Sequence, residues 1–124
     1  LPRHVATVPG RAAELAAEDI VPDPPVFRYA EAATTAELIP LLAESVAKAK
    51  QTLTGFDDEK MAATWRLQRD GRDVMSVPRA AFVRAIMLNH WYHHRGQLLV
   101  YLRLLDQSVP PVYGPTADEN PFAA

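Results

Sequence analysis

The sequence predicts an all-α, up-and-down helical bundle that carries a small β-hairpin just before its last helix. Segments 38–53 and 79–106 have apolar residues at the spacing of an amphipathic helix, and 3–19 has a shorter stripe of the same kind. Between segments 38–53 and 79–106, residues 57–77 show the alternation of apolar and polar residues that is typical of strands. The length of 124 residues suits one domain, which we place over 1–124.

The first helical segment, 3–19, is interrupted by Pro9-Gly10. Proline inside a helix removes a backbone donor and usually kinks the helix, so we expect either one bent helix or two short ones. The segment that follows, 20–33, contains three prolines within IVPDPPVFRYAEAA and has no periodicity. It is therefore expected to be a long extended connection.

The second helical segment begins at Thr34-Thr35-Ala36-Glu37, which has the form of a capping box. In that motif the Thr34 hydroxyl accepts a backbone amide of the first turn, and Glu37 reaches back to the amide of the cap. Gly55 is expected to end the helix. In the strand region, the dipeptide Asp70-Gly71 is typical of a hairpin turn.

The last helix, 79–106, places two histidines on its apolar stripe. His90 and His94 are one turn apart on the same face, so both imidazoles can ligate one ion. A buried histidine pair also occurs as a hydrogen-bonded part of a core, and a third ligand would decide between these interpretations. Besides His4, the candidates are carboxylates: Asp57, Asp58, Asp118 and Glu119.

The neighbours of this histidine pair have ordinary roles in our interpretation. His93 lies about 100° round the helix from His94, so we do not expect it to join the pair on one ion. Trp91 occupies the position at which a zinc-peptidase helix carries its general-base glutamate, which argues against that chemistry. Gly96 is attributed to close helix packing rather than to room beside a site.

Composition excludes several classes of function. Lys and Arg number 13 against 15 Asp and Glu, the net charge is -2, and there is no run of like charges, so nucleic acid is not an expected partner. No apolar stretch approaches the roughly 18 residues that span a bilayer, and no signal-type segment is present, so we expect a cytoplasmic protein without a membrane partner. The absence of cysteine excludes disulfides, thiolate metal sites and thiol nucleophiles.

The run NHWYHHRGQL at 89–98, continued by the tail PPVYGPTADE, resembles the DinB-like family. The resemblance is close over 86–119. A second patch, RHVATVPG at 3–10, is similar to an earlier stretch of the family in which a histidine precedes a Pro-Gly pair. The segment between the two patches matches in outline.

The resemblance implies a four-helix bundle in which three histidines hold a divalent metal ion, one from the second helix and two from the last. Carried over to this chain, the ligands are His4, His90 and His94. The family's first helix would precede Leu1, so we expect a further helix of about 20 to 30 residues ahead of it. The family includes thiol-dependent S-transferases and proteins described as metal-dependent hydrolases.

Three neutral imidazoles do not compensate the charge of a divalent ion, a setting that favours a bound hydroxide or thiolate. We therefore expect a metal-dependent thiol S-transferase or hydrolase that acts on a small molecule, with a low-molecular-weight thiol as a candidate cofactor. Arg95, or Arg3, would bind the carboxylate of that cofactor. Zinc, nickel, iron, cobalt and manganese all suit the site. The alternative is a non-catalytic metal-binding or dimerising bundle, and a homodimer is left open.

Overall fold

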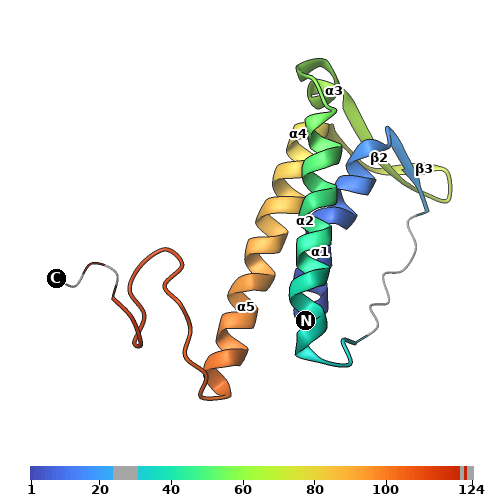
Figure 1. Cartoon of the computed structure of the whole chain (residues 1–124). Helices are drawn as coiled ribbons and strands as arrows, with labels where there is room; N and C mark the ends of the chain where they lie inside the picture. Colours follow the sequence, from blue (N-terminus) through green and yellow to red (C-terminus); the bar gives the residue numbers. More distant parts are fainter. Residues whose placement is uncertain (24–30, 121, 123–124) are drawn as a thin grey trace.

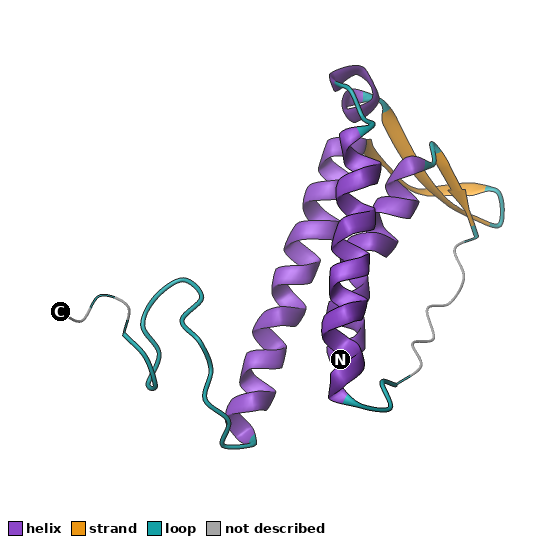
Figure 2. Ribbon diagram, viewed as in Figure 1, coloured by secondary structure: helices purple, strands orange, loops and turns teal. Residues whose placement is uncertain are grey.

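The computed structural model describes residues 1–23, 31–120 and 122. Helices dominate, and a small sheet lies at one end of the molecule (Figures 1 and 2). The elements in chain order are α1 (Pro2–Ala17), β1 (Ile20–Pro22), η1 (Thr35–Glu37), α2 (Leu38–Thr54), α3 (Asp58–Ala62), β2 (Thr64–Arg69), β3 (Arg72–Pro78), α4 (Arg79–Phe82), η2 (Val83–Asn89) and α5 (His90–Leu104). The last three form one continuous helix. A fourth long helix of the expected bundle is not among the described residues.

The long helices α1 and α2 run parallel to each other, so the up-and-down order is wrong for this pair (Figure 1). The amide of Gly10 donates to the Ser45 hydroxyl at 2.8 Å, and Glu14 forms an ion pair with Lys48, so the contacts advance along both helices in the same direction. A Cβ at Gly10 would lie 3.0 Å from the Ser45 carbonyl oxygen. Glycine therefore permits the close approach of the two backbones.

A long connection makes the parallel arrangement possible. An up-and-down bundle is typically joined by short loops, whereas here the chain between α1 and α2 returns to the end at which α1 began (Figure 1). The segment 20–33, predicted to be an extended connection, contributes strand β1 at its start. Its residues 24–30 lie outside the described part of the chain.

The predicted hairpin is confirmed, but it belongs to a three-stranded sheet rather than standing alone. β2 and β3 are antiparallel, and β1 adds to β2 in parallel with Ile20 opposite Arg66. Asp70 and Gly71 have φ angles of 50° and 71°, the left-handed values that a tight hairpin turn requires. The parallel strand was not predicted because its three residues carry no alternation.

The core lies where α1, η2 and the sheet meet. Trp65 on β2 is 1% exposed, stacks on Phe82 with ring centroids 3.9 Å apart, and donates its indole N–H to the carbonyl of Leu15 at 2.9 Å. Small residues of α1, Ala13 and Ala16, are fully buried against this cluster. Their size lets the aromatic rings pack directly against the helix.

Arg79 is a fully buried cation that closes the C-terminal end of α1. Its guanidinium donates to the carbonyls of Ala16 at 2.7 Å and Glu18 at 3.2 Å, and also contacts the Lys60 carbonyl and the Asp19 carboxylate. The last carbonyls of a helix lack intrahelical donors, and a cation beside them is favourable. This contact fixes the start of the last helix against the end of α1.

Pro9 lies inside α1, which is a single helix rather than two. Because proline has no N–H, the carbonyl of Val5 receives no helical hydrogen bond from position 9. The indole N–H of Trp91 donates to this carbonyl at 2.8 Å. The carbonyl that Pro9 leaves without a helical donor in α1 is thus bound by a side chain of the last helix. Together with the contact of Arg79 to Ala16, this shows that α1 and the last helix run antiparallel.

The last helix contains a π-helical segment, η2, immediately before His90. The backbone N–H of His90 donates to the carbonyl of Ala85, five residues earlier, instead of four. Segments of this kind shift the phase of a helix and are frequent at functional sites. The residues before and after it, such as Phe82 and His94, therefore do not share a single α-helical stripe.

Two further predictions are corrected by the described residues. No side-chain capping bond forms at the start of α2; instead the Thr34 hydroxyl donates to the Glu37 carboxylate at 3.4 Å, because the first turn is a 3₁₀ turn. The attribution of Gly96 to close packing is wrong, since a Cβ there meets nothing within 4 Å in this part of the chain.

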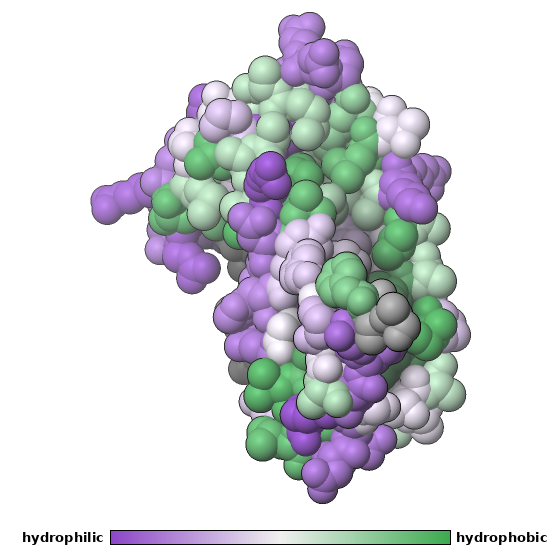
Figure 3. All heavy atoms as spheres, turned by 90° about the vertical axis from the view of Figure 1, so that its left-hand side faces the viewer, coloured by the Kyte–Doolittle hydropathy of each residue, from purple (hydrophilic) through white to green (hydrophobic). Residues whose placement is uncertain are grey.

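The outer side of α5 is exposed to solvent and partly apolar. Figure 3, which faces α5 and the C-terminal tail, shows apolar patches among polar ones, and Val100, Leu104 and Leu105 are between 60% and 73% exposed. Within the described residues, none of the helices combines the length and the hydrophobicity needed to cross a bilayer.

Trp91→Phe should lower the free energy of unfolding by about 1–3 kcal/mol, because the partly buried carbonyl of Val5 loses the indole N–H and the smaller ring buries less surface. Urea denaturation at constant temperature measures this change. The same substitution in a Pro9→Ala background should cost less, because residue 9 then has an N–H for the Val5 carbonyl. An equal cost in both backgrounds would contradict this role of the indole.

Candidate metal centre

The structure brings three histidines from two helices into one cluster. His4 lies in the first turn of α1, His90 is the first residue of α5, and His94 follows one turn later. One ring nitrogen from each lies within 4.8 Å of the other two. We refer to His4, His90 and His94 as the histidine cluster.

The three rings meet edge to face. The ring centroid of His94 is 4.4 Å from those of His4 and His90, and His4 and His90 are 5.2 Å apart. The Nε2 atoms of His90 and His94 are 2.9 Å apart. Lone pairs from different directions thus converge on one small volume, which is the arrangement that a metal ion requires.

The contact between Trp91 and Val5 explains why the cluster forms at this level of the bundle. Val5 is adjacent in sequence to His4, and Trp91 is adjacent to His90. The hydrogen bond from the indole to the Val5 carbonyl therefore fixes the two histidine-bearing backbones beside each other. The third histidine follows from the helical spacing of four residues.

The environment of His4 and His90 favours their neutral form. The pKa of His4 is lowered to about 4, chiefly by burial and then by the proximity of His94, His90 and the amino terminus. The pKa of His90 is lowered as well, first by burial and then by His94 and His93, while the carbonyl of Ile86 opposes the shift. Neutral imidazoles keep the lone pairs that bind a metal ion.

The donor set fits a divalent metal ion. Among the described residues, the group that offers converging ligand atoms consists of the three histidines. In addition, the Nδ1 atom of His90 is buried and makes no hydrogen bond of good geometry within the described part of the chain. Three imidazole nitrogens on a +2 ion match the ligand sets of open metal sites, in which a fourth position is left for another molecule.

Two of the carboxylate alternatives, Asp57 and Asp118, are used elsewhere in the fold. Asp57 caps α3 by accepting from the amide of Lys60 at 2.7 Å. Asp118 pairs with Arg103 at 2.7 Å, which lowers the pKa of the carboxyl, and it accepts from the amide of Val109. In the described structure the carboxylate of Asp118 therefore fastens the tail to α5.

His93 and Arg95 lie on the same helix as His90 and His94 but are not part of the converging group. His93 is exposed, with its ring centroid 5.0 Å from that of His94, and it is not part of the converging group. The guanidinium of Arg95 lies between the rings of Tyr92 and Tyr113, 5.0 and 5.1 Å from their centroids. The role of Arg95 in binding a cofactor stays a prediction.

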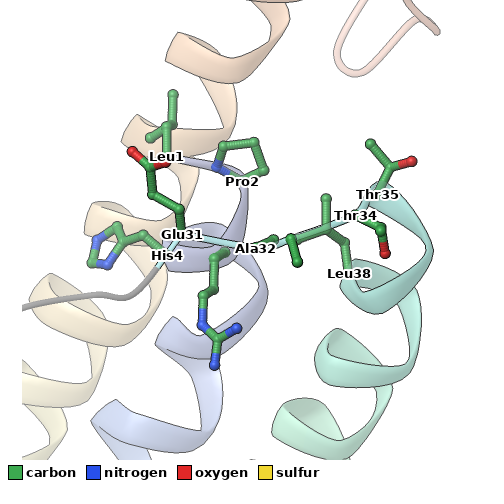
Figure 4. Close-up of a pocket in the computed structure, with 10 residues that line it drawn as sticks. Leu1, Pro2, His4, Glu31, Ala32, Thr34, Thr35 and Leu38 are labelled. Carbon is green, nitrogen blue, oxygen red and sulfur yellow. The ribbon is translucent and has the colours of Figure 1, made fainter.

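A cavity of about 520 Å³ adjoins His4 at the open end of α1 (Figure 4). In Figure 4 the labelled side chains of Leu1, Glu31 and His4 lie close together at one side of it. The cavity is lined by Leu1, Pro2, Arg3, His4, Glu31, Ala32, Ala33, Thr34, Thr35 and Leu38. It brings one cationic and one anionic side chain next to the histidine cluster, a feature that sequence spacing did not reveal.

A smaller apolar groove of about 250 Å³ also touches the cluster. Its walls are formed by α1 and η2, and its lining residues are His4, Val8, Arg11, Ala12, Leu15, Ile86 and His90. Apolar walls exclude water from one side of the imidazoles, which contributes to the low pKa of His4 and His90.

In metal-free protein, the free energy of unfolding should fall as the pH decreases from about 6.5 to about 4. The unfolded chain protonates His4 near the ordinary pKa of 6.5, whereas the folded protein does so only near 4, so acid favours the unfolded state across this interval. Urea denaturation of the wild type and of His4→Gln at several pH values measures the effect. His4→Gln should show a shallower pH dependence, with exposed His93→Gln as the control; identical slopes for all three would exclude the assigned cause.

Comparisons with known proteins identify the family. The model of the DinB family matches residues 28–121, which is more than half of the chain. The match includes His90 and His94 and leaves out His4, so the third histidine of the cluster rests on the folded structure. Searches of curated proteins and of solved structures found no significant match to the chain. The histidine-bearing helix, the helical fold and the family match agree, and the chain belongs to the DinB family.

Proposed function

We propose that the protein is a divalent-metal-dependent enzyme that acts on a small molecule at the histidine cluster. The observation that carries this proposal is the convergence of three imidazole nitrogens within 4.8 Å beside a cavity of about 520 Å³. A structural histidine cluster has no need of an adjoining cavity, whereas a catalytic one requires it.

His4, His90 and His94 would hold the ion, each through one ring nitrogen. When bound, the ion would supply Lewis acidity, which at neutral pH favours the anionic form of a thiol or of water. The lowered pKa values of His4 and His90 support binding without a prior loss of protons from these two ligands. Zinc, nickel, iron, cobalt and manganese all accept such donors.

Thiol S-transfer is the first candidate reaction, and Arg3 is the residue that favours it. Arg3 lines the cavity next to His4, and its ion pair with Glu37 is long at 4.0 Å and partly exposed. Such a pair contributes little, so the guanidinium can accept a carboxylate from a ligand. A low-molecular-weight thiol that carries a carboxylate would thus be bound by Arg3 with its sulfur directed to the cluster.

Hydrolysis is the second candidate, favoured by Glu31. This carboxylate lines the same cavity as His4 and is exposed. A carboxylate within reach of the reacting water can accept its proton as a general base. The two reactions differ in the residue on which they depend, which makes them separable by substitution.

The wild type should bind about one divalent ion per chain, measured by elemental analysis after dialysis. His90→Ala and His94→Ala should abolish binding, and His4→Ala should weaken it severely, because each removes one of three ligands. His93→Ala is the matched control on the same helix and should keep the metal. Full metal retention by His4→Ala would exclude the assigned ligand set.

Cobalt-substituted protein should show a charge-transfer band in the near ultraviolet when millimolar thiols are added, because a divalent cation displaces the thiol proton. Arg3→Ala should weaken the response to thiols that carry a carboxylate more than the response to uncharged thiols. Loss of metal-dependent turnover in Glu31→Gln with thiol binding unchanged would favour hydrolysis. No spectral change with any thiol, and no metal-dependent turnover of electrophiles, esters or amides, would leave a non-catalytic metal-binding or dimerising bundle.

A further inference from the structure

We propose that Gln97 is a positioning residue that fixes the tautomer and the orientation of His94, so that the Nε2 atom of His94 is the one offered to a metal ion. This inference rests on the proposed metal site. It concerns the tautomer and the ring orientation of His94 in the metal-free protein.

Both ring nitrogens of His94 have defined neighbours. Nδ1 lies 2.7 Å from the side-chain oxygen Oε1 of Gln97, and Nε2 lies 2.9 Å from the Nε2 atom of His90. A carbonyl oxygen can only accept a hydrogen bond, so Nδ1 of His94 must carry the proton. In the neutral ring the lone pair is then on Nε2, which faces the interior of the histidine cluster.

The position of Gln97 on the helix makes this contact local. Gln97 follows His94 by three residues, and residues with this spacing lie on the same face of a helix. The Gln97 side chain is exposed, and a Cβ at the adjacent Gly96 would have open space around it. The contact therefore requires no other element of the fold, and its loss should not disturb packing.

The cluster offers a contrast within the same helix. His90 has no side-chain acceptor of this kind in the described structure: its Nδ1 atom is buried without a hydrogen bond of good geometry, and the acceptor that acts on its ring is the backbone carbonyl of Ile86. His94 is the ligand farther along α5, a helix with no fully buried residue, and its ring contacts are made by the other histidines. A hydrogen bond from the non-ligating nitrogen is the usual means by which proteins orient a histidine ligand.

The test compares Gln97→Leu, which removes the acceptor, with Gln97→Glu, which retains one. Gln51→Leu is the matched control, because it makes the same change at an exposed position of α2. Zinc affinity is measured by competition with a chromophoric chelator. Gln97→Leu should bind zinc about 10- to 100-fold more weakly than the wild type, whereas Gln97→Glu and Gln51→Leu should remain close to it.

Two further measurements separate positioning from a general structural effect. The urea midpoint of the metal-free protein should be the same in all four proteins. Long-range nitrogen–proton correlation spectra of the metal-free wild type should show His94 protonated at Nδ1, and this preference should be lost in Gln97→Leu. A wild-type protein with His94 protonated at Nε2, or equal zinc affinity in Gln97→Leu, would overturn the inference. A wild type that binds no metal at all would overturn the proposed site with it.

Discussion

The hydrogen bond from the Trp91 indole to the Val5 carbonyl is the contact on which the arrangement of the site depends. Pro9 makes that carbonyl available, and the buried guanidinium of Arg79 fixes the opposite ends of the same two helices. Val5 and Ala16 are 11 residues apart on α1, and Arg79 and Trp91 are 12 apart on the last helix. At about 1.5 Å per residue these stretches are nearly equal in length, and the π-helical segment lies in the longer one. The hydrogen bond of Trp91 and the buried guanidinium of Arg79 therefore together fix how α1 and the last helix are aligned along their length.

The histidine cluster is partly buried, and charged side chains lie at its border. Imidazoles that are partly buried and close together resist protonation, so the cluster is prepared for a cation and poorly suited to an ion pair with a carboxylate. Charged groups lie at its border, where Arg3 and Glu31 line the cavity. The charged side chains thus lie on the cavity side of the histidine cluster, while the apolar groove between α1 and η2 excludes water from its other side.

Local features of the fold and of the site could be predicted from the sequence, because they depend on neighbours along the chain. The spacing of His90 and His94, the Asp70-Gly71 turn and the limits of α2 are of this kind. The parallel pairing of α1 with α2 could not be predicted, because it depends on where α2 begins relative to α1, which local periodicity does not determine. The π-helical segment was missed for another reason: a single additional residue in one turn leaves the apolar pattern compatible with a regular helix. Residues and spacing left open which group joins the histidine pair; the resemblance pointed to His4, and the folded chain places it there across 86 residues.

The absence of buried residues from α5 has a consequence for the energetics of the site. Beyond the contact of Trp91, a helix with no fully buried side chain opens at a lower free energy than the core, and its amides exchange with solvent accordingly. His90 stands at the boundary between the packed half of the last helix and this loosely held half, and His94 lies within the latter. A ligand that bridges His4 and His94 would therefore tie this half of the helix to α1, and part of its binding free energy would oppose the opening of the helix.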